Sequence, residues 1–216
     1  MKNFIILISK GRNLLKTLVY LKFYNIYIKE NLSYTRKLIY KTNYKYLYII
    51  IIKNIDIIFY INNNLVDFIF FGKDLLLEEK INIFYKFYNL NFINFYISLI
   101  SNLKLFKIFN LKKIYLATKY LNISKYYFNY LNIINISFLK INSSSELLIN
   151  MNKSDLIIDI ISSGKTIIEN NLYNLFNLIK LNNILLLNLN LIYKKIFINF
   201  FYKKFIYNIF NVIFYI

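Results

Sequence analysis

The stretch DLIIDIISSGKTIIENN, from Asp155 to Asn171, decides the fold prediction because it contains a strand, a loop and the start of a helix in immediate succession. The apolar run Asp155–Ile161 predicts a buried strand, and the spacing of apolar residues in Thr166–Ile179 predicts a helix after it. Hydroxyl residues and Gly164, one of only three glycines, lie between the two. A strand, a loop and a helix in this order form the repeating unit of α/β proteins.

The same order recurs along the chain. Phe4–Ile8 predicts a strand, and the segment after it, LLKTLVYLKFY, carries leucines at helical spacing. This alternation predicts an α/β fold with mixed, mostly parallel sheets, in which ligands bind at the carboxyl ends of strands. The other expected elements are strands at Tyr46–Lys53, Val66–Asp74 with its loop, Lys113–Leu116 and Ile184–Ile192, and a helix at Asp56–Asn62.

The composition excludes several kinds of catalysis. The 216 residues are 58% hydrophobic, which is enough for a substantial core. The chain has no cysteine and no histidine, so it has no disulfide, no thiolate metal site, no cysteine nucleophile and no imidazole base. Catalysis by a Ser-His-Asp or Cys-His arrangement is therefore excluded.

The formal net charge of +18 has two interpretations. It follows from lysine enrichment of the kind that codon bias in an AT-rich genome produces, and it also suits a nucleic-acid or anionic-membrane partner. We expect no nucleic-acid and no membrane partner, because no compact basic cluster with interleaved aromatic residues stands out. No run of about 18 apolar residues predicts a membrane span, because asparagines interrupt the charge-free stretch Phe87–Leu103. The amino end has too short an apolar run for a secretory signal, so we expect an intracellular, cytoplasmic protein.

The three glycines stand in similar surroundings. Gly11 lies in SKGR, Gly72 in FGKD and Gly164 in SSGKT, each after a strand-like run. A glycine there permits a positive φ and a close approach of backbone to ligand, and the adjacent basic residue can neutralise an anion. Three ordinary turns would give the same pattern. SSGKT is not a Walker A loop, since Asp159 stands where that motif requires glycine.

The loop after the last of these strands predicts a phosphate site. Ser162–Lys165 would offer backbone N–H groups and hydroxyls at a helix start, where the helix dipole favours an anion. Asp155 and Asp159 share strand parity, so both side chains project from one face. Paired carboxylates beside a phosphate suit a sugar phosphate, through its ribose hydroxyls or through Mg²⁺. The alternative is a solvated acidic pair at a strand end.

Taken together, six segments resemble the ATP phosphoribosyltransferase family in its short form, in the family's order and spacing. They cover nearly the whole chain. The segments are ILISKGRNLL (Ile6–Leu15), YTRKLIY (Tyr34–Tyr40), VDFIFFGKDLLLEE (Val66–Glu79), LATKYLNISKYYF (Leu116–Phe128), SSSELL (Ser143–Leu148) and DLIIDIISSGKTIIENNL (Asp155–Leu172).

The chain also departs from the family pattern. Lys53 stands where the family has arginine, which keeps the charge and loses the planar fork of donors. Residues other than glycine or proline occupy positions where the family usually has one of these two. These positions are Ile8 or Ser9, Ile58, Asn64, Ile69, Asn91 and Ser143.

The resemblance implies a two-lobed fold of the type II periplasmic-binding-protein kind, with a cleft between the lobes. Lobe one would comprise residues 1–92 plus 184–216, and lobe two residues 93–183 with the phosphoribosyl-pyrophosphate loop. The apolar tail Ile196–Ile216 has helical periodicity, and we expect it to be buried against lobe one or another subunit.

The resemblance also implies roles for individual residues. Ser162, Ser163, Gly164, Lys165 and Thr166 would hold the 5-phosphate of phosphoribosyl pyrophosphate, and Asp155 and Asp159 would face its ribose. Lys10 and Arg12, with Gly11, would meet the polyphosphate of a substrate, and Lys10, Arg12 and Asp159 are the expected catalytic residues. Further substrate-binding candidates are Arg36, Lys53, Asp74 and Glu146.

The implied reaction is that of a glycosyltransferase in histidine biosynthesis. It joins N1 of the ATP adenine to C1 of the phosphoribosyl group and expels pyrophosphate with inversion and with Mg²⁺ as the cofactor. The reaction needs no nucleophilic side chain, so a chain without histidine or cysteine can carry it out by positioning and electrostatics. The length of the chain leaves no room for the regulatory domain of the long form, and the expected partner is a regulatory subunit resembling histidyl-tRNA synthetase.

Two other classes of function remain open at this stage. A non-catalytic two-lobed protein that binds a phosphorylated small molecule would bind its ligand without releasing pyrophosphate. A basic protein associated with membranes or nucleic acid would show salt-sensitive DNA retention or detergent-dependent solubility.

Overall fold

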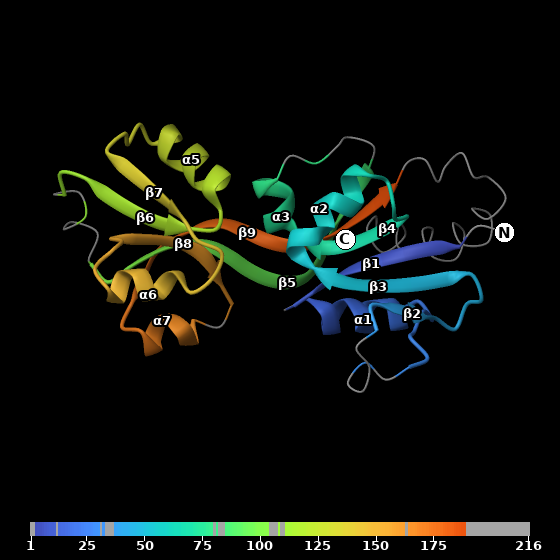
Figure 1. Ribbon diagram of the computed structural model, residues 1–216. Helices are drawn as coiled ribbons and strands as arrows, with labels where there is room; N and C mark the ends of the chain where they lie inside the picture. Colours follow the sequence, from blue (N-terminus) through green and yellow to red (C-terminus); the bar gives the residue numbers. More distant parts are fainter. Residues whose placement is uncertain are drawn as a thin grey trace. The chain divides into compact units, whose positions relative to one another are not determined.

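The computed structural model describes residues 3–11, 13–30, 32, 37–79, 81, 85–103, 108, 111–162 and 164–188, with the backbone alone at 85–88 and 91–94. The chain divides into two compact units. Unit 1 comprises Met1–Gly72, Ile81–Phe92 and Asn183–Ile216, and unit 2 comprises Lys73–Lys80 and Ile93–Asn182. Figure 1 shows the elements of each unit.

Unit 1 is built on three parallel strands whose sequences are almost continuously apolar. Strand β1 (Phe4–Lys10) lies between β3 (Leu47–Lys53) and β4 (Phe68–Gly72). Continuous apolar runs such as these are typical of parallel strands that are buried on both faces. Ile6, Ile49 and Phe70, one from each strand, are fully buried in one core cluster.

Other described elements of unit 1 surround these strands. Strand β2 (Ile39–Lys41) pairs antiparallel with β3, and the carboxyl-terminal part of β9 (Tyr173–Asn188) pairs antiparallel with β4. Helix α1 (Leu14–Phe23) follows β1, and helix α2 (Asn54–Asn62) follows β3. The predicted order of strand and helix is confirmed here.

Unit 2 also contains three parallel strands. Its strand order is β5-β8-β6-β7, with bounds Tyr85–Ser101 for β5, Leu156–Ile161 for β8, Ile114–Thr118 for β6 and Ile136–Lys140 for β7. Strands β6, β7 and β8 run parallel, and β5 pairs antiparallel with β8. Leu116, Ile158 and Ile97 are fully buried in its main core cluster. Helices with described bounds in this unit are α3 (Lys73–Glu78), α5 (Leu121–Tyr130), α6 (Ser145–Asn150) and α7 (Lys165–Glu169).

The helix predicted at Thr166–Ile179 is wrong beyond its first turn. Helix α7 ends at Glu169, and β9 begins at Tyr173. Asn171 adopts φ +53°, and the N–H groups of Asn171 and Leu172 donate to the carbonyls of Ile168 and Ile167. These bonds close the end of a helix, so the chain continues as a strand from this point.

Two apolar segments singled out in the sequence have different outcomes. Phe87–Leu103, for which no element was predicted, lies mostly within β5. The prediction for the tail Ile196–Ile216 lies outside the described residues. Among the helices of the described ranges, none is long and apolar enough to cross a membrane.

Candidate functional site

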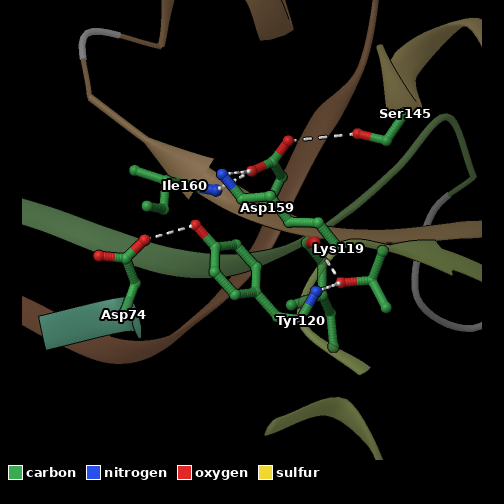
Figure 2. A network of polar contacts seen from close by, with 8 residues as sticks. Asp74, Lys119, Tyr120, Ser145, Asp159 and Ile160 are labelled. Carbon is green, nitrogen blue, oxygen red and sulfur yellow. Dashed lines mark hydrogen bonds and ion pairs between the residues drawn. The ribbon is translucent and has the colours of Figure 1, made fainter. Parts of the chain in front are cut away.

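The carboxyl ends of the parallel strands of unit 2 bring together residues that are far apart in the sequence. Lys119 follows β6, Ser145 follows β7 and begins α6, and Asp159 lies near the end of β8. Parallel strands place these ends at one edge of the sheet, which is where ligands bind in α/β proteins. Figure 2 shows the resulting polar network.

Asp159 is the centre of this network. Its Oδ1 accepts a hydrogen bond of 2.7 Å from the backbone N–H of Ile160, and its Oδ2 accepts one of 3.3 Å from Ser145 Oγ (Figure 2). Lys119 Nζ lies 3.7 Å from Oδ1. The Asp159 side chain is 23% exposed. A carboxylate has about four acceptor positions, so the two donors found among the described residues leave capacity for the hydroxyls of a ligand.

A buried tyrosine lies beside this carboxylate. Tyr120 is 3% exposed, and its hydroxyl donates a 3.0 Å hydrogen bond to Asp74 Oδ2. Lys119 Nζ lies 4.6 Å from the centroid of the Tyr120 ring, within the range of a cation–π contact. The prediction named Asp74, and it did not name Lys119, Tyr120 or Ser145.

A second carboxylate of α3 is also buried. Glu78 is 8% exposed, and its two oxygens accept hydrogen bonds of 2.9 and 3.1 Å from the N–H of Asn122 and one of 3.1 Å from the N–H of Ile123. These N–H groups belong to the first turn of α5, where helix N–H groups have no intrahelical partner. Glu78 therefore holds the start of α5 directly after Lys119 and Tyr120.

The predicted phosphate loop follows β8. Gly164 has φ +72° and precedes the first residue of α7, and a Cβ added at this glycine would meet nothing within 4 Å. The requirement for glycine is therefore conformational. Ser162, Lys165 and Thr166 are exposed, and Ser163 lies outside the described residues.

Asp155 lies at the opposite end of the strand. It is four positions from Asp159 in the sequence, a distance of about 13 Å along an extended strand. Its Oδ2 accepts a 2.8 Å hydrogen bond from the N–H of Tyr115, and its carbonyl accepts one of 2.7 Å from Ser101 Oγ. The expectation that both aspartates face one ribose is corrected, because shared parity puts them on one face without bringing them together. The Asp155 carboxylate instead supports the pairing of β6 with β8.

The predicted basic residues of unit 1 are placed in part. Lys10 and Lys53 are the last residues of β1 and β3, they are register partners, and both are exposed. Gly11 follows with φ +138°, a conformation that favours glycine. Two neighbouring ammonium groups at strand ends suit an anionic ligand. Arg12 and Arg36 lie outside the described residues.

The remaining candidate, Glu146, lies in the first turn of α6 next to Ser145 and is half-buried. The described residues contain no group of three or more Asp, Glu, His or Cys side chains that could hold a metal ion. The donor set fits a cation of the Mg²⁺ type only where substrate phosphates supply most of the ligands, with one or two carboxylates from the protein.

Comparison with known proteins identifies relatives of the chain. The sequence model of the family described as HisG, ATP phosphoribosyltransferase, matches residues 53–208. A protein of Brachyspira hyodysenteriae named ATP phosphoribosyltransferase is 36% identical over 144 residues, which are 67% of this chain and 68% of the relative. One of the same name from Clostridium botulinum (strain Okra) is 34% identical over 176 residues, which are 80% of this chain and 81% of the relative.

Solved structures share the fold. The ATP phosphoribosyl transferase (HisG:HisZ) complex from Thermotoga maritima contains a chain with a TM-score of 0.70 at 24% identity, with 86% of each chain covered. A probable amino-acid ABC transporter extracellular-binding protein from Bacillus subtilis has a TM-score of 0.54 at 11% identity, covering 88% of this chain and 86% of that one. The predicted α/β fold of the periplasmic-binding-protein kind is confirmed.

Proposed function

The chain belongs to the ATP phosphoribosyltransferase family, and from this premise we propose how its residues carry out the family's reaction. That reaction joins N1 of the ATP adenine to C1 of 5-phosphoribosyl 1-pyrophosphate and releases pyrophosphate, as the first step of histidine biosynthesis. The lone pair of N1 forms the new bond, and the electrons of the broken C1–O bond leave with pyrophosphate. The protein has to align two anions and stabilise the departing one.

Asp159 is the residue that carries the proposal for the sugar. Its carboxylate lies at the carboxyl edge of β8, is held by Ser145 and Ile160, and keeps acceptor capacity. In the proposal it accepts hydrogen bonds from the ribose hydroxyls. Glu146, one residue after Ser145, would face the same ribose.

The phosphate groups would be bound by two loops. Residues Ser162–Thr166 would hold the 5-phosphate, supported by the glycine conformation at Gly164 and the start of α7. Lys10 and Arg12, with Gly11 between them, would bind the polyphosphate of a substrate. Arg36, Lys53 and Asp74 complete the proposed substrate contacts, and the paired lysines at the ends of β1 and β3 support this assignment.

Enzymes of this family use a metal ion in catalysis. We propose that the ion is Mg²⁺ and that it is bound chiefly by the pyrophosphate group of the substrate, since the described residues offer no cage of three ligands. When bound, the ion would neutralise charge on the leaving pyrophosphate.

The setting of the enzyme is also a proposal. The solved relative from Thermotoga maritima is a complex of two kinds of chain, and we propose that this chain likewise assembles with a regulatory subunit resembling histidyl-tRNA synthetase, as a short form. The proposed lobes are residues 1–92 plus 184–216 and residues 93–183, except that Lys73–Lys80 are assigned to the second lobe because they belong to unit 2. The proposed location is the cytoplasm, where ATP and the other metabolites of amino-acid biosynthesis are found.

The test is pyrophosphate release from ATP, Mg²⁺ and phosphoribosyl pyrophosphate, with and without the regulatory subunit. Asp159→Asn keeps the shape of the side chain and removes its charge, and we expect turnover to fall by about a hundredfold or more because the ribose loses a charged acceptor and one of its two acceptor oxygens. Lys10→Ala should cause a loss of similar size. Asp56→Asn is the matched control, because Asp56 is an exposed acid of α2 with no proposed role.

Two results would count against this assignment. Unchanged turnover in Asp159→Asn, with the fold checked by circular dichroism, would remove Asp159 from the site. Tight binding of phosphoribosyl pyrophosphate without any pyrophosphate release, even with the regulatory subunit present, would favour the non-catalytic binding protein.

A further inference from the structure

Lys119 occupies an unusual position at the candidate site. Its Nζ lies 3.7 Å from Asp159 Oδ1 and 4.6 Å from the ring centroid of Tyr120, so the ammonium group contacts both a carboxylate and an aromatic ring (Figure 2). The Lys119 side chain is 36% exposed. It is therefore open to a ligand while two neighbours restrict its position.

The backbone around Lys119 is fixed from both sides. Thr118 Oγ1 donates a 2.8 Å hydrogen bond to the carbonyl of Ile158 in β8 and accepts one of 2.9 Å from the N–H of Tyr120. Glu78 holds the N–H groups that follow, and Asp74 accepts from the Tyr120 hydroxyl. The direction in which Lys119 leaves the end of β6 is thus set by contacts to β8 and α3.

The distance between the charges decides whether Lys119 supports Asp159 or competes with its ligand. At 3.7 Å the ammonium lies beyond the 2.7–3.2 Å typical of a hydrogen bond, so it attracts the carboxylate without occupying an acceptor position. A ribose hydroxyl can still donate to Asp159. The same positive charge would also attract a substrate that carries two phosphorylated ends.

We propose that Lys119 is a positioning residue for the phosphoribosyl substrate, which orients the Asp159 carboxylate toward the ribose and adds a positive charge beside it. The proposal rests on the proposed function and assigns a role to a residue outside the set expected from the family resemblance. The Tyr120 ring supports the Lys119 ammonium group, and Asp74 accepts from the Tyr120 hydroxyl.

The experiment measures the affinity of the full chain for phosphoribosyl pyrophosphate by calorimetry, without ATP, and then KM and kcat with the regulatory subunit. For Lys119→Met, which keeps the length of the side chain and removes its charge, we expect about tenfold weaker binding and a similar rise in KM for phosphoribosyl pyrophosphate. The kcat and the KM for ATP should change less than threefold, roughly, because the contact is made in both ground and transition states. Lys119→Arg should recover most of the affinity.

The chain offers a matched control at the other end of the same strand. Lys113 Nζ lies 5.3 Å from the ring centroid of Tyr115, and no carboxylate lies within ion-pair distance of Lys113 among the described residues. Lys113→Met removes the same charge from a lysine over a tyrosine and should leave the affinity unchanged. An equal loss of affinity in both variants would show that the loss comes from the change in net charge alone, and it would overturn the proposal.

Other outcomes separate this inference from the function on which it rests. Equal or tighter binding by Lys119→Met would show competition with the ligand and overturn the inference alone, as would Lys119→Arg binding as weakly as Lys119→Met. If the unaltered chain binds the substrate without turnover, the proposed function fails while the comparison of affinities still decides the role of Lys119. A wild-type chain that does not bind phosphoribosyl pyrophosphate overturns both.

Discussion

At the scale of single residues, asparagine takes the position that glycine commonly occupies at the carboxyl end of a helix. Five asparagines adopt φ between 53° and 59°, each in the second position after the last residue of a helix. Each donates its N–H to a carbonyl of the last turn, and the next residue donates to an earlier one, which is the Schellman arrangement. Asparagine tolerates the left-handed region better than other residues with a Cβ. These residues are Asn25, Asn64, Asn132, Asn152 and Asn171.

The effect on stability of having asparagine rather than glycine at a helix end can be measured at Asn132, which is exposed at the end of α5. We expect Asn132→Gly to raise the free energy of unfolding by about 0.5 kcal/mol and Asn132→Ala to lower it by about 1 kcal/mol, because alanine meets the full Cβ penalty at positive φ. Urea denaturation measures both. The matched control is Asn129→Ala on the exposed face of α5, where alanine should stabilise by up to about 0.7 kcal/mol. The same sign at both positions would contradict the conformational explanation.

At the scale of elements, the helix–strand boundary near Glu169 shows the limit of periodicity. Ile167, Ile168 and Leu172 have helical spacing, and the residues after Tyr173 continue an apolar pattern that fits either element. The chain passes from helix to strand at Asn171, which has a left-handed conformation. Because the sequence contains many asparagines, nothing in it marks this one as the residue that ends the helix. The chain has three glycines and no proline, so the residues that usually mark the end of a helix are scarce. The boundaries of its helices depend instead on which asparagine adopts the left-handed conformation.

The contact of α3 with α5 gives a prediction at the same scale. Glu78→Gln should lower the free energy of unfolding by about 1–3 kcal/mol, because one of the two oxygens that accept from the first turn of α5 becomes an amide that cannot accept. Glu79→Gln is the control, since Glu79 is the exposed neighbour. Chemical denaturation measures both variants. Equal stability of the two variants would show that the hydrogen bonds of Glu78 contribute nothing beyond those of a surface acid.

At the scale of the whole molecule, sequence patterns predicted the architecture better than they predicted the neighbours at the site. Apolar runs and the order of strands and helices are local signals, and the sheets follow them. The contact between Lys119 and Asp159 depends on the parallel pairing of β6 with β8, which aligns Thr118 with Ile158. Residues so far apart in the sequence carry no local sign of such pairing. Ser145 was missed for the same reason, since it reaches Asp159 from the start of α6.

The net charge of +18 gives a prediction for the molecule as a whole. Like charges repel more strongly in the compact state than in the unfolded chain, and salt screens this repulsion. Raising sodium chloride from about 20 to about 500 mM should therefore raise Tm by about 2–4 °C, equivalent to about 1 kcal/mol for a chain of this size. The affinity for phosphoribosyl pyrophosphate should fall over the same range, because the same ions screen the attraction of basic side chains for an anion. Thermal unfolding and calorimetry measure the two effects, with sucrose as the control that stabilises without screening. A Tm that falls with salt would mean that attractive ion pairs outweigh repulsion in the folded chain, despite its excess of lysine.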